Sequence, residues 1–270
     1  MSISEDKELN MKIGFFDSGL GGLIILKAVA KHLSDYDYEY YGDTANVPYG
    51  DKTETEIYTL TKAGVEHLFK RDCALVIIAC NTASAQTLRK LQDTILVGKY
   101  VDKRILGVII PTVETVTGSG VKEVMLFATS RTVDSQKYEK EFSKLDSSLQ
   151  LKAKALPGLV PLIESGEWDK AEEVICAEAK LAIESGCKNI ILGCTHYSLL
   201  KEKVRAVQGV GKVYSQDEII PKKLADYLNR HPEITQKLSN TGKREIIITK
   251  HNPHCDRLTA EFLGGVYIPE

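Results

Sequence analysis

Short apolar runs alternate with longer amphipathic segments along most of the chain. The runs of five or six residues have the length and composition of buried strands, and the segments between them repeat apolar residues at helical spacing. This alternation predicts an α/β fold of mostly parallel sheets flanked by helices. The expected strands are 12–16, 38–42, 74–79, 105–110, 123–128, 151–155, 188–193 and 244–249, and the expected helices are 21–33, 53–70, 84–96, 134–144, 170–185, 197–207, 217–229 and 255–263.

The pattern repeats once. In the first half, 63 positions separate Asp17, which follows a strand, from Cys80, which follows another; in the second half, 65 positions separate Thr129 from Cys194. Cys73 precedes Cys80 by seven positions, and Cys187 precedes Cys194 by seven. The shared order predicts two copies of one α/β unit.

The repeat sets the expected domains. We predict two pseudo-symmetric domains, one of residues 1–103 plus 215–270 and the other of residues 104–214. Open α/β sheets bind ligands at the carboxyl ends of their strands. The active site is therefore expected in the interdomain cleft, and we expect closure of the two domains to control access to it.

Composition excludes several classes of protein. Of 270 residues, 43% are hydrophobic, and 35 basic against 37 acidic side chains leave a net charge of −2. Such a balance lacks the basic footprint of a nucleic-acid-binding protein. No stretch approaches about 20 consecutive apolar residues, and the polar start does not resemble a signal peptide. We therefore expect a cytoplasmic protein with neither nucleic acid nor membrane as partner.

The six cysteines are expected to be free thiols, because a cytoplasmic protein seldom carries a disulfide framework. No C-x-x-C pair is present, so no structural metal is expected. In the tail, His251, His254 and Cys255 form either a metal site or a solvated loop. The isolated cluster favours the loop.

Cys80 and Cys194 differ from the other cysteines in their settings. Each ends an apolar strand and is followed by polar residues that open a helix. The positive end of the helix dipole is expected to lower a thiol pKa from about 8.5, which suits a group that both takes and returns protons. A matched pair suits proton exchange on two faces of one carbon. The alternative role, a small buried hydrophobe, is assigned to Cys73, Cys176 and Cys187.

A nucleotide site is not indicated. Gly19 and Gly21 form G-x-G, but Ile24 breaks G-x-G-x-x-G, and no G-K-S/T is present. The glycines are interpreted as a tight turn that lets strand and helix pack closely, with Asp17 and Ser18 facing the cleft. Other polar residues have structural alternatives: His196 as a core histidine, Asp43 as a turn cap, and Glu164 as a surface carboxylate.

Five motifs lie at the ends of predicted elements. They are Asp17-Ser18-Gly19-Leu20-Gly21-Gly22, Gly42-Asp43-Thr44 through Pro48-Tyr49-Gly50, Ala79-Cys80-Asn81-Thr82-Ala83-Ser84, Val160-Pro161-Leu162-Ile163-Glu164 and Gly193-Cys194-Thr195-His196-Tyr197. Together these motifs resemble glutamate racemases, members of the cofactor-independent aspartate/glutamate racemase family. The resemblance covers residues 12 to about 200, and the Cys-Thr-His-Tyr form of the second cysteine motif separates the chain from aspartate racemases.

The resemblance implies an activity and a set of roles. It implies a racemase of bacterial cell-wall synthesis that interconverts L- and D-glutamate without a cofactor and forms a homodimer. Cys80 would remove the α-proton of D-glutamate and Cys194 that of L-glutamate, with Asp17 assisting Cys80 and His196 assisting Cys194. Asp43 and Glu164 match supporting carboxylates. The matched substrate-binding residues are Asp17, Ser18, Tyr49, Gly50, Asn81, Thr82, Thr195 and His196.

The chain departs from the family pattern at Ser198, at Leu156, in residues 213–216 and in the tail from 239 onward. Three alternatives stay open. The chain could act on aspartate or a hydantoin; it could be a one-thiol decarboxylase or Cys–His amidohydrolase built on Cys194 and His196; or it could be a non-catalytic amino-acid sensor.

Overall fold

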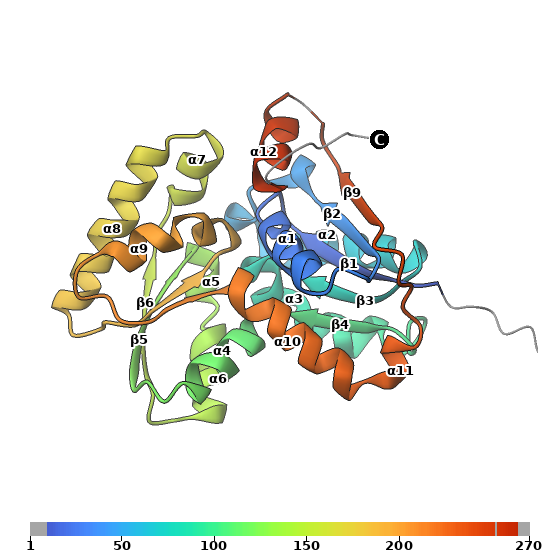
Figure 1. The fold of residues 1–270 in the computed structure, drawn as a ribbon, viewed down its shortest axis with the longest axis horizontal. Coiled ribbons are helices and arrows are strands. Elements are labelled where there is room, and N and C mark those ends of the chain that lie inside the picture. The colour runs from blue at the N-terminus through green and yellow to red at the C-terminus, as the bar shows by residue number, and fades with distance from the viewer. Residues whose placement is uncertain (1–9, 252, 264–270) are drawn as a thin grey trace, which may run out of the picture.

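Two parallel sheets, each flanked by helices, lie side by side in the computed structural model (Figure 1). The structure describes residues 10–251 and 253–263. The first sheet has the strand order β4-β3-β1-β2-β9 and the second the order β6-β5-β7-β8. The predicted α/β architecture is confirmed. The strands are β1 Lys12–Asp17, β2 Tyr38–Gly42, β3 Cys73–Ile78, β4 Arg104–Gly107, β5 Glu123–Ala128, β6 Gln150–Ala155, β7 Ile190–Gly193, β8 Val213–Ser215 and β9 Arg244–Ile248.

Both sheets repeat one topology. The order β4-β3-β1-β2 in the first sheet corresponds to β8-β7-β5-β6 in the second, so β3 and β7 occupy equivalent places. Cys80 follows β3 and Cys194 follows β7. The internal repeat predicted from cysteine spacing is therefore present in the strand order.

Helices cover both sheets (Figure 1). A capping box between Thr53 and Glu56 starts α2. Among the described helices, none combines the length and apolar character needed to cross a membrane. The helices are α1 Gly22–His32, α2 Glu54–Lys70, α3 Asn81–Ile95, α4 Ile109–Gly118, α5 Ser130–Asp134, α6 Lys137–Leu145, α7 Leu159–Glu164, α8 Trp168–Glu184, α9 Lys201–Ala206, α10 Gln216–Arg230, α11 Pro232–Thr235 and α12 Pro253–Leu263, with short 3₁₀ segments η1 Thr44–Asn46, η2 Tyr49–Asp51 and η3 Thr195–Leu200.

The core extends from one sheet to the other. The interior strand β3 is buried at every position, as expected for a parallel strand covered on both faces. Helix α1 packs against α10 and against η3, which follows β7. One cluster of buried apolar side chains therefore includes Phe15 and Leu23 of the first unit with Leu192 and Tyr197 of the second.

The structure corrects the sequence prediction around residue 108. The apolar run predicted as strand 105–110 is β4 only to Gly107, and α4 begins at Ile109. Pro111 fits the first turn of that helix, where its missing N–H would have no partner inside the helix. β4 pairs with β3, so the first sheet includes residues 104–107, which the predicted boundary at 103/104 assigns to the second domain.

Candidate active site

A pocket of about 300 Å³ opens between the carboxyl ends of the two sheets. Residues from both units line it. Of the twelve site residues predicted from the sequence, ten lie in its wall: Ser18, Tyr49, Gly50, Cys80, Asn81, Thr82, Glu164, Cys194, Thr195 and His196. A smaller pocket of about 160 Å³, between α4 and α10, contains none of the twelve.

Cys80 ends the β3 run and is the N-cap residue of α3. Its Sγ accepts hydrogen bonds from the Ser18 hydroxyl at 3.1 Å and from the Ala83 N–H at 3.4 Å. Burial, followed by the charge of Asp17, raises the pKa of Cys80 to about 12, although both hydrogen bonds act in the opposite direction. The predicted lowering of this pKa is therefore wrong, because loss of solvent outweighs the donors at the helix start.

Cys194 lies at the equivalent place in the second unit, between β7 and η3. Its Sγ is 4.0 Å from Nδ1 of His196, and Nε2 of His196 is 2.9 Å from Oε1 of Glu164. Burial lowers the pKa of His196, but the contacts with Cys194 and Glu164 outweigh burial and raise that pKa to about 10. A protonated His196 donates from both ring nitrogens, so it joins a carboxylate to the sulfur.

Asp17 is buried at the end of β1 and is not among the pocket-lining residues. Its Oδ2 accepts a hydrogen bond from the Gly19 N–H at 3.0 Å. Burial raises the pKa of Asp17, against the opposing effects of His196 and the N–H groups of Gly19 and Gly22. Its charge acts on the pKa of Cys80, so Asp17 is placed to influence that thiol from behind the pocket wall.

Asp43, which follows β2, also lies behind the pocket wall. Its Oδ2 accepts a hydrogen bond from the Tyr49 hydroxyl at 2.8 Å, and its Oδ1 accepts one from Nδ2 of Asn46 at 2.8 Å. Asp43 thereby shapes the segment that brings Tyr49 and Gly50 to the pocket.

Gly21 allows the two units to approach closely. A Cβ at this position would lie 2.3 Å from the Thr195 hydroxyl and 2.6 Å from the His196 ring. The glycine loop after β1 therefore brings the start of α1 against η3 of the other unit. Gly22 matches the interpretation of the loop as a close strand–helix turn, because a Cβ there would lie 2.8 Å from Cβ of Asp17 in β1.

Asn81 belongs to a buried polar network that the sequence did not reveal. Its Nδ2 donates to Oε1 of Gln216 at 2.7 Å, and Nε2 of Gln216 donates back to Oδ1 of Asn81 at 2.9 Å. The Tyr138 hydroxyl donates to the same Oδ1 at 2.9 Å. These residues come from α3, α10 and α6, so the network fixes Asn81 from three separate elements.

The second unit contributes wall residues that sequence analysis did not assign. Thr129 directly follows β5, and Asp17 is the last residue of the equivalent strand β1. The Thr129 hydroxyl lies 3.1 Å from that of Thr82. The matching places of Thr129 and Asp17 in the two repeated units are the sequence signal that could have identified Thr129 as a site residue. The other unassigned wall residues in the second unit are Ser130, Leu156, Pro157, Gly158, Val160 and Pro161.

The pocket combines two thiols, hydroxyl groups and amides. Among the residues that the structure describes, no group of three His, Cys, Asp or Glu side chains is arranged to hold a metal ion. Of the predicted tail cluster, His251 contacts Asp256 and His254 contacts Arg257. The donors and thiols suit proton transfer at a small polar substrate.

Comparison with known sequences identifies relatives along most of the chain. A family model described as Asp/Glu/Hydantoin racemase matches residues 24–217. A glutamate racemase of Jannaschia sp. (strain CCS1) is 42% identical over 240 residues, which cover 83% of this chain and 87% of that protein. A glutamate racemase of Paracoccus denitrificans (strain Pd 1222) is 40% identical, with the same shares covered.

Solved structures share the arrangement of both units. Glutamate racemase from Francisella tularensis subsp. tularensis SCHU S4, in complex with D-glutamate, has a TM-score of 0.84 at 26% identity and covers 95% of this chain and 94% of its own. The enzyme from Thermus thermophilus, in complex with beta-chloro-D-alanine, has a TM-score of 0.77 at 31% identity and covers 96% of this chain and 94% of its own.

Proposed function

The chain belongs to the Asp/Glu/Hydantoin racemase family, and we propose that it interconverts L-glutamate and D-glutamate through Cys80 and Cys194. One observation carries this proposal: the two cysteines follow equivalent strands of two repeated units and line the same pocket. A stereocentre held between them presents one face to each sulfur.

Each direction of the reaction uses the sulfurs in opposite roles. With D-glutamate, the Cys80 thiolate takes the α-proton, and the Cys194 thiol then gives its own proton to the opposite face of the carbanion. With L-glutamate, the Cys194 thiolate takes the proton and the Cys80 thiol returns one. Each turnover therefore exchanges the protonation states of the two sulfurs, and solvent exchange or the reverse reaction restores them.

The surroundings of each sulfur favour its thiolate when substrate binds. The ammonium group of glutamate adds a positive charge to the pocket, which opposes the effects of burial and Asp17 on Cys80. Ser18 and the Ala83 N–H stabilise charge on Cys80, and protonated His196 does so beside Cys194. Fixed donors of this kind stabilise developing charge without reorganising during the reaction.

Polar groups of the pocket wall are available for the carboxylates and the ammonium group of the substrate. We assign this role to Ser18, Tyr49, Gly50, Asn81, Thr82, Thr195 and His196, with Asp17, Asp43 and Glu164 in support. Asn81 and Thr82 are suited to this role because partners from other elements already fix their side chains.

Circular dichroism of the substrate tests the proposal. Pure L- and D-glutamate should both lose optical activity, and L-aspartate should lose it much more slowly. Cys80→Ser and Cys194→Ser should each lower the rate by about 10²- to 10⁴-fold. Cys176→Ser is the matched control, because Cys176 lies on α8 away from the pocket. Faster turnover of aspartate, or full activity in either cysteine variant, would contradict the proposal.

We infer that the reaction needs no cofactor and supplies D-glutamate for peptidoglycan synthesis. Activity should survive exhaustive dialysis against a chelator and treatment with borohydride, which inactivates pyridoxal enzymes. Expression of the chain should allow growth of a bacterium that requires external D-glutamate. Loss of activity on dialysis, or failure of an expressed, active protein to support growth, would overturn the corresponding inference.

We further propose that the two sheets belong to domains that close on the substrate in a cytoplasmic homodimer. On this proposal, β4 belongs to the first domain, and the chain passes into the second after Gly107 and back again near Gln216. If the domains close, saturating glutamate should slow backbone hydrogen exchange around the pocket. If the protein is a homodimer, sedimentation should give twice the monomer mass. Cell fractionation should place the protein in the cytoplasm.

A further inference from the structure

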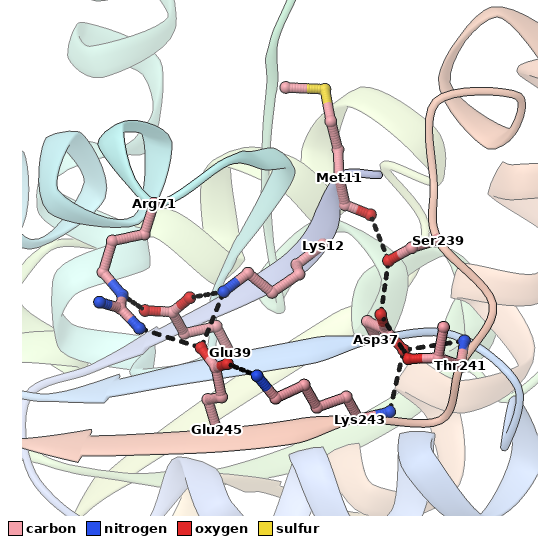
Figure 2. Close-up of polar contacts among 9 residues, drawn as sticks. All are labelled: Met11, Lys12, Asp37, Glu39, Arg71, Ser239, Thr241, Lys243 and Glu245. Carbon is pink, nitrogen blue, oxygen red and sulfur yellow. Dashed lines mark hydrogen bonds and ion pairs between the residues drawn. The ribbon is translucent and has the colours of Figure 1, made fainter. Parts of the chain in front are cut away.

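The C-terminal strand β9 is held in one register by a cluster of charges (Figure 2). Glu39 of β2 and Glu245 of β9 are direct neighbours on adjacent strands. Lys12 lies between them, with its Nζ 2.5 Å from Glu39 and 2.8 Å from Glu245, and Arg71 bridges both carboxylates. A slip of one residue in either direction would remove Glu245 from these cations and place Arg244 or Ile246 there.

The segment before β9 is also fixed. Asp37 accepts hydrogen bonds from the Ser239 hydroxyl at 2.6 Å, from the Thr241 hydroxyl at 2.8 Å and from the Lys243 N–H at 2.9 Å (Figure 2). Both anchors act at the start of β9. They determine which residue follows the far end of β9, next to the segment after β2.

That residue is Thr249. Its N–H donates to the Gly42 carbonyl at 3.0 Å, directly after the last pair of β2 and β9. Its hydroxyl donates to Oδ1 of Asp43 at 3.1 Å and accepts from the Ala45 N–H at 2.9 Å. One hydroxyl from the C-terminal segment thus joins the carboxylate and the backbone of the segment that follows β2.

Asp43 connects Thr249 to the pocket wall. Its second oxygen accepts the hydrogen bond from the Tyr49 hydroxyl, and Tyr49 lines the pocket. The next residue strengthens the connection, because the Lys250 N–H donates to the Thr44 hydroxyl at 2.8 Å and that hydroxyl donates to the Lys250 carbonyl at 3.1 Å.

We propose that Thr249 is a positioning residue for substrate binding, which acts through Asp43 to hold Tyr49 and Gly50 in the pocket wall. The inference rests on the proposed glutamate racemisation for its kinetic readout. Thr249 touches no substrate. Its role is to fix the 43–51 segment, and the ion cluster around Glu39 sets the register that brings it there.

The test compares Thr249→Val, which removes the hydroxyl at nearly constant shape, with Thr249→Ser, which keeps it. In Thr249→Val, we expect KM for both enantiomers to rise about five- to tenfold with a smaller change in kcat. The hydroxyl makes two hydrogen bonds, and at this exposed position each contributes less than the roughly 1 kcal/mol of a typical hydrogen bond. Thr249→Ser should stay within about twofold of the unchanged protein. Thr59→Val is the matched control, because Thr59 is an exposed threonine of α2 whose hydroxyl donates only to its own helix.

Hydrogen exchange gives a readout that does not depend on turnover. Amides of residues 43–51 should exchange several-fold faster in Thr249→Val than in Thr249→Ser or Thr59→Val. Unchanged exchange with unchanged KM would overturn the inference while leaving glutamate racemisation intact. Faster exchange with unchanged KM would also overturn it, because Thr249 would then be structural alone. If the wild-type protein fails to racemise glutamate, the proposed function is wrong. Hydrogen exchange then still tests the contact between Thr249 and Asp43, because exchange equal in Thr249→Val and Thr249→Ser would reject it.

Discussion

The hydroxyl of Ser18 donates a hydrogen bond to the sulfur of Cys80 over 3.1 Å. Ser18 follows β1 and Cys80 follows β3, which are neighbouring strands of the first sheet. Parallel pairing therefore sets this distance. The hydrogen bond favours the thiolate on a sulfur whose pKa burial raises to about 12.

Replacing Ser18 by alanine should slow racemisation. A hydrogen bond to a charged group contributes about 1.5–3 kcal/mol, so kcat/KM should fall roughly 10- to 100-fold. The fall must be equal for both enantiomers, because their equilibrium constant is unity. The α-deuterium isotope effect should nevertheless increase more with D-glutamate, from which Cys80 takes the proton. Ser143→Ala, at an exposed position of α6, is the control, and an unchanged kcat/KM in Ser18→Ala would count against the assigned role.

His196 should make stability decrease on the alkaline side. Its ordinary pKa of 6.5 is raised in the folded protein to about 10. The folded state therefore holds this proton more tightly, and the stabilisation is complete below about pH 6.5 and is lost as pH rises toward 10. His196→Asn should be less stable than the unchanged protein by about 2 kcal/mol at pH 6 and should differ less at pH 9.5. Urea unfolding at both pH values measures this difference; an equal difference at both would reject the raised pKa.

Glu245 should affect stability on the acid side. Hydrogen bonds from Lys12 and then Lys243 lower its pKa from 4.5 to about 2, against the effect of burial. Its contribution is therefore present above about pH 4.5 and is lost as pH falls toward 2. Glu245→Gln should destabilise the protein by about 1 kcal/mol at pH 7, and the difference should narrow below pH 4. Glu184→Gln, at an exposed position near the end of α8, supplies the baseline; a difference that stays constant with pH would contradict the prediction.

Local sequence patterns predict the parts of the site that follow strands. Cys80 and Cys194 could be placed at one cleft because each ends an apolar run and the runs repeat in the same order. The helix that begins at Ile109 was missed because a Val-Ile-Ile run has no helical period, and only Pro111 signals the helix start. The raised pKa of Cys80 depends on burial by residues distant in sequence. The prediction of a lowered pKa considered only the helix that follows Cys80 and did not include this burial.

Contacts between distant segments could not be predicted from one sequence. Gln216 reaches Asn81 across 135 positions and Thr249 reaches Asp43 across 206. Neither Gln216 nor Thr249 belongs to a motif, and a single glutamine or threonine is ordinarily a surface residue. Their roles follow from sheet register and helix packing, which only the folded chain specifies.

Deuterium incorporation tests the two-sulfur account most directly. Each enantiomer of α-protiated glutamate is converted in heavy water to a few per cent, and product and remaining substrate are analysed separately by mass spectrometry. Two opposed thiols predict one deuterium at the α-carbon of the product and none in the remaining substrate, for both enantiomers, because the sulfur that donates has exchanged with solvent before the proton arrives at the other. Product that retains the substrate's own α-hydrogen would mean that a single base serves both faces, and would contradict the account.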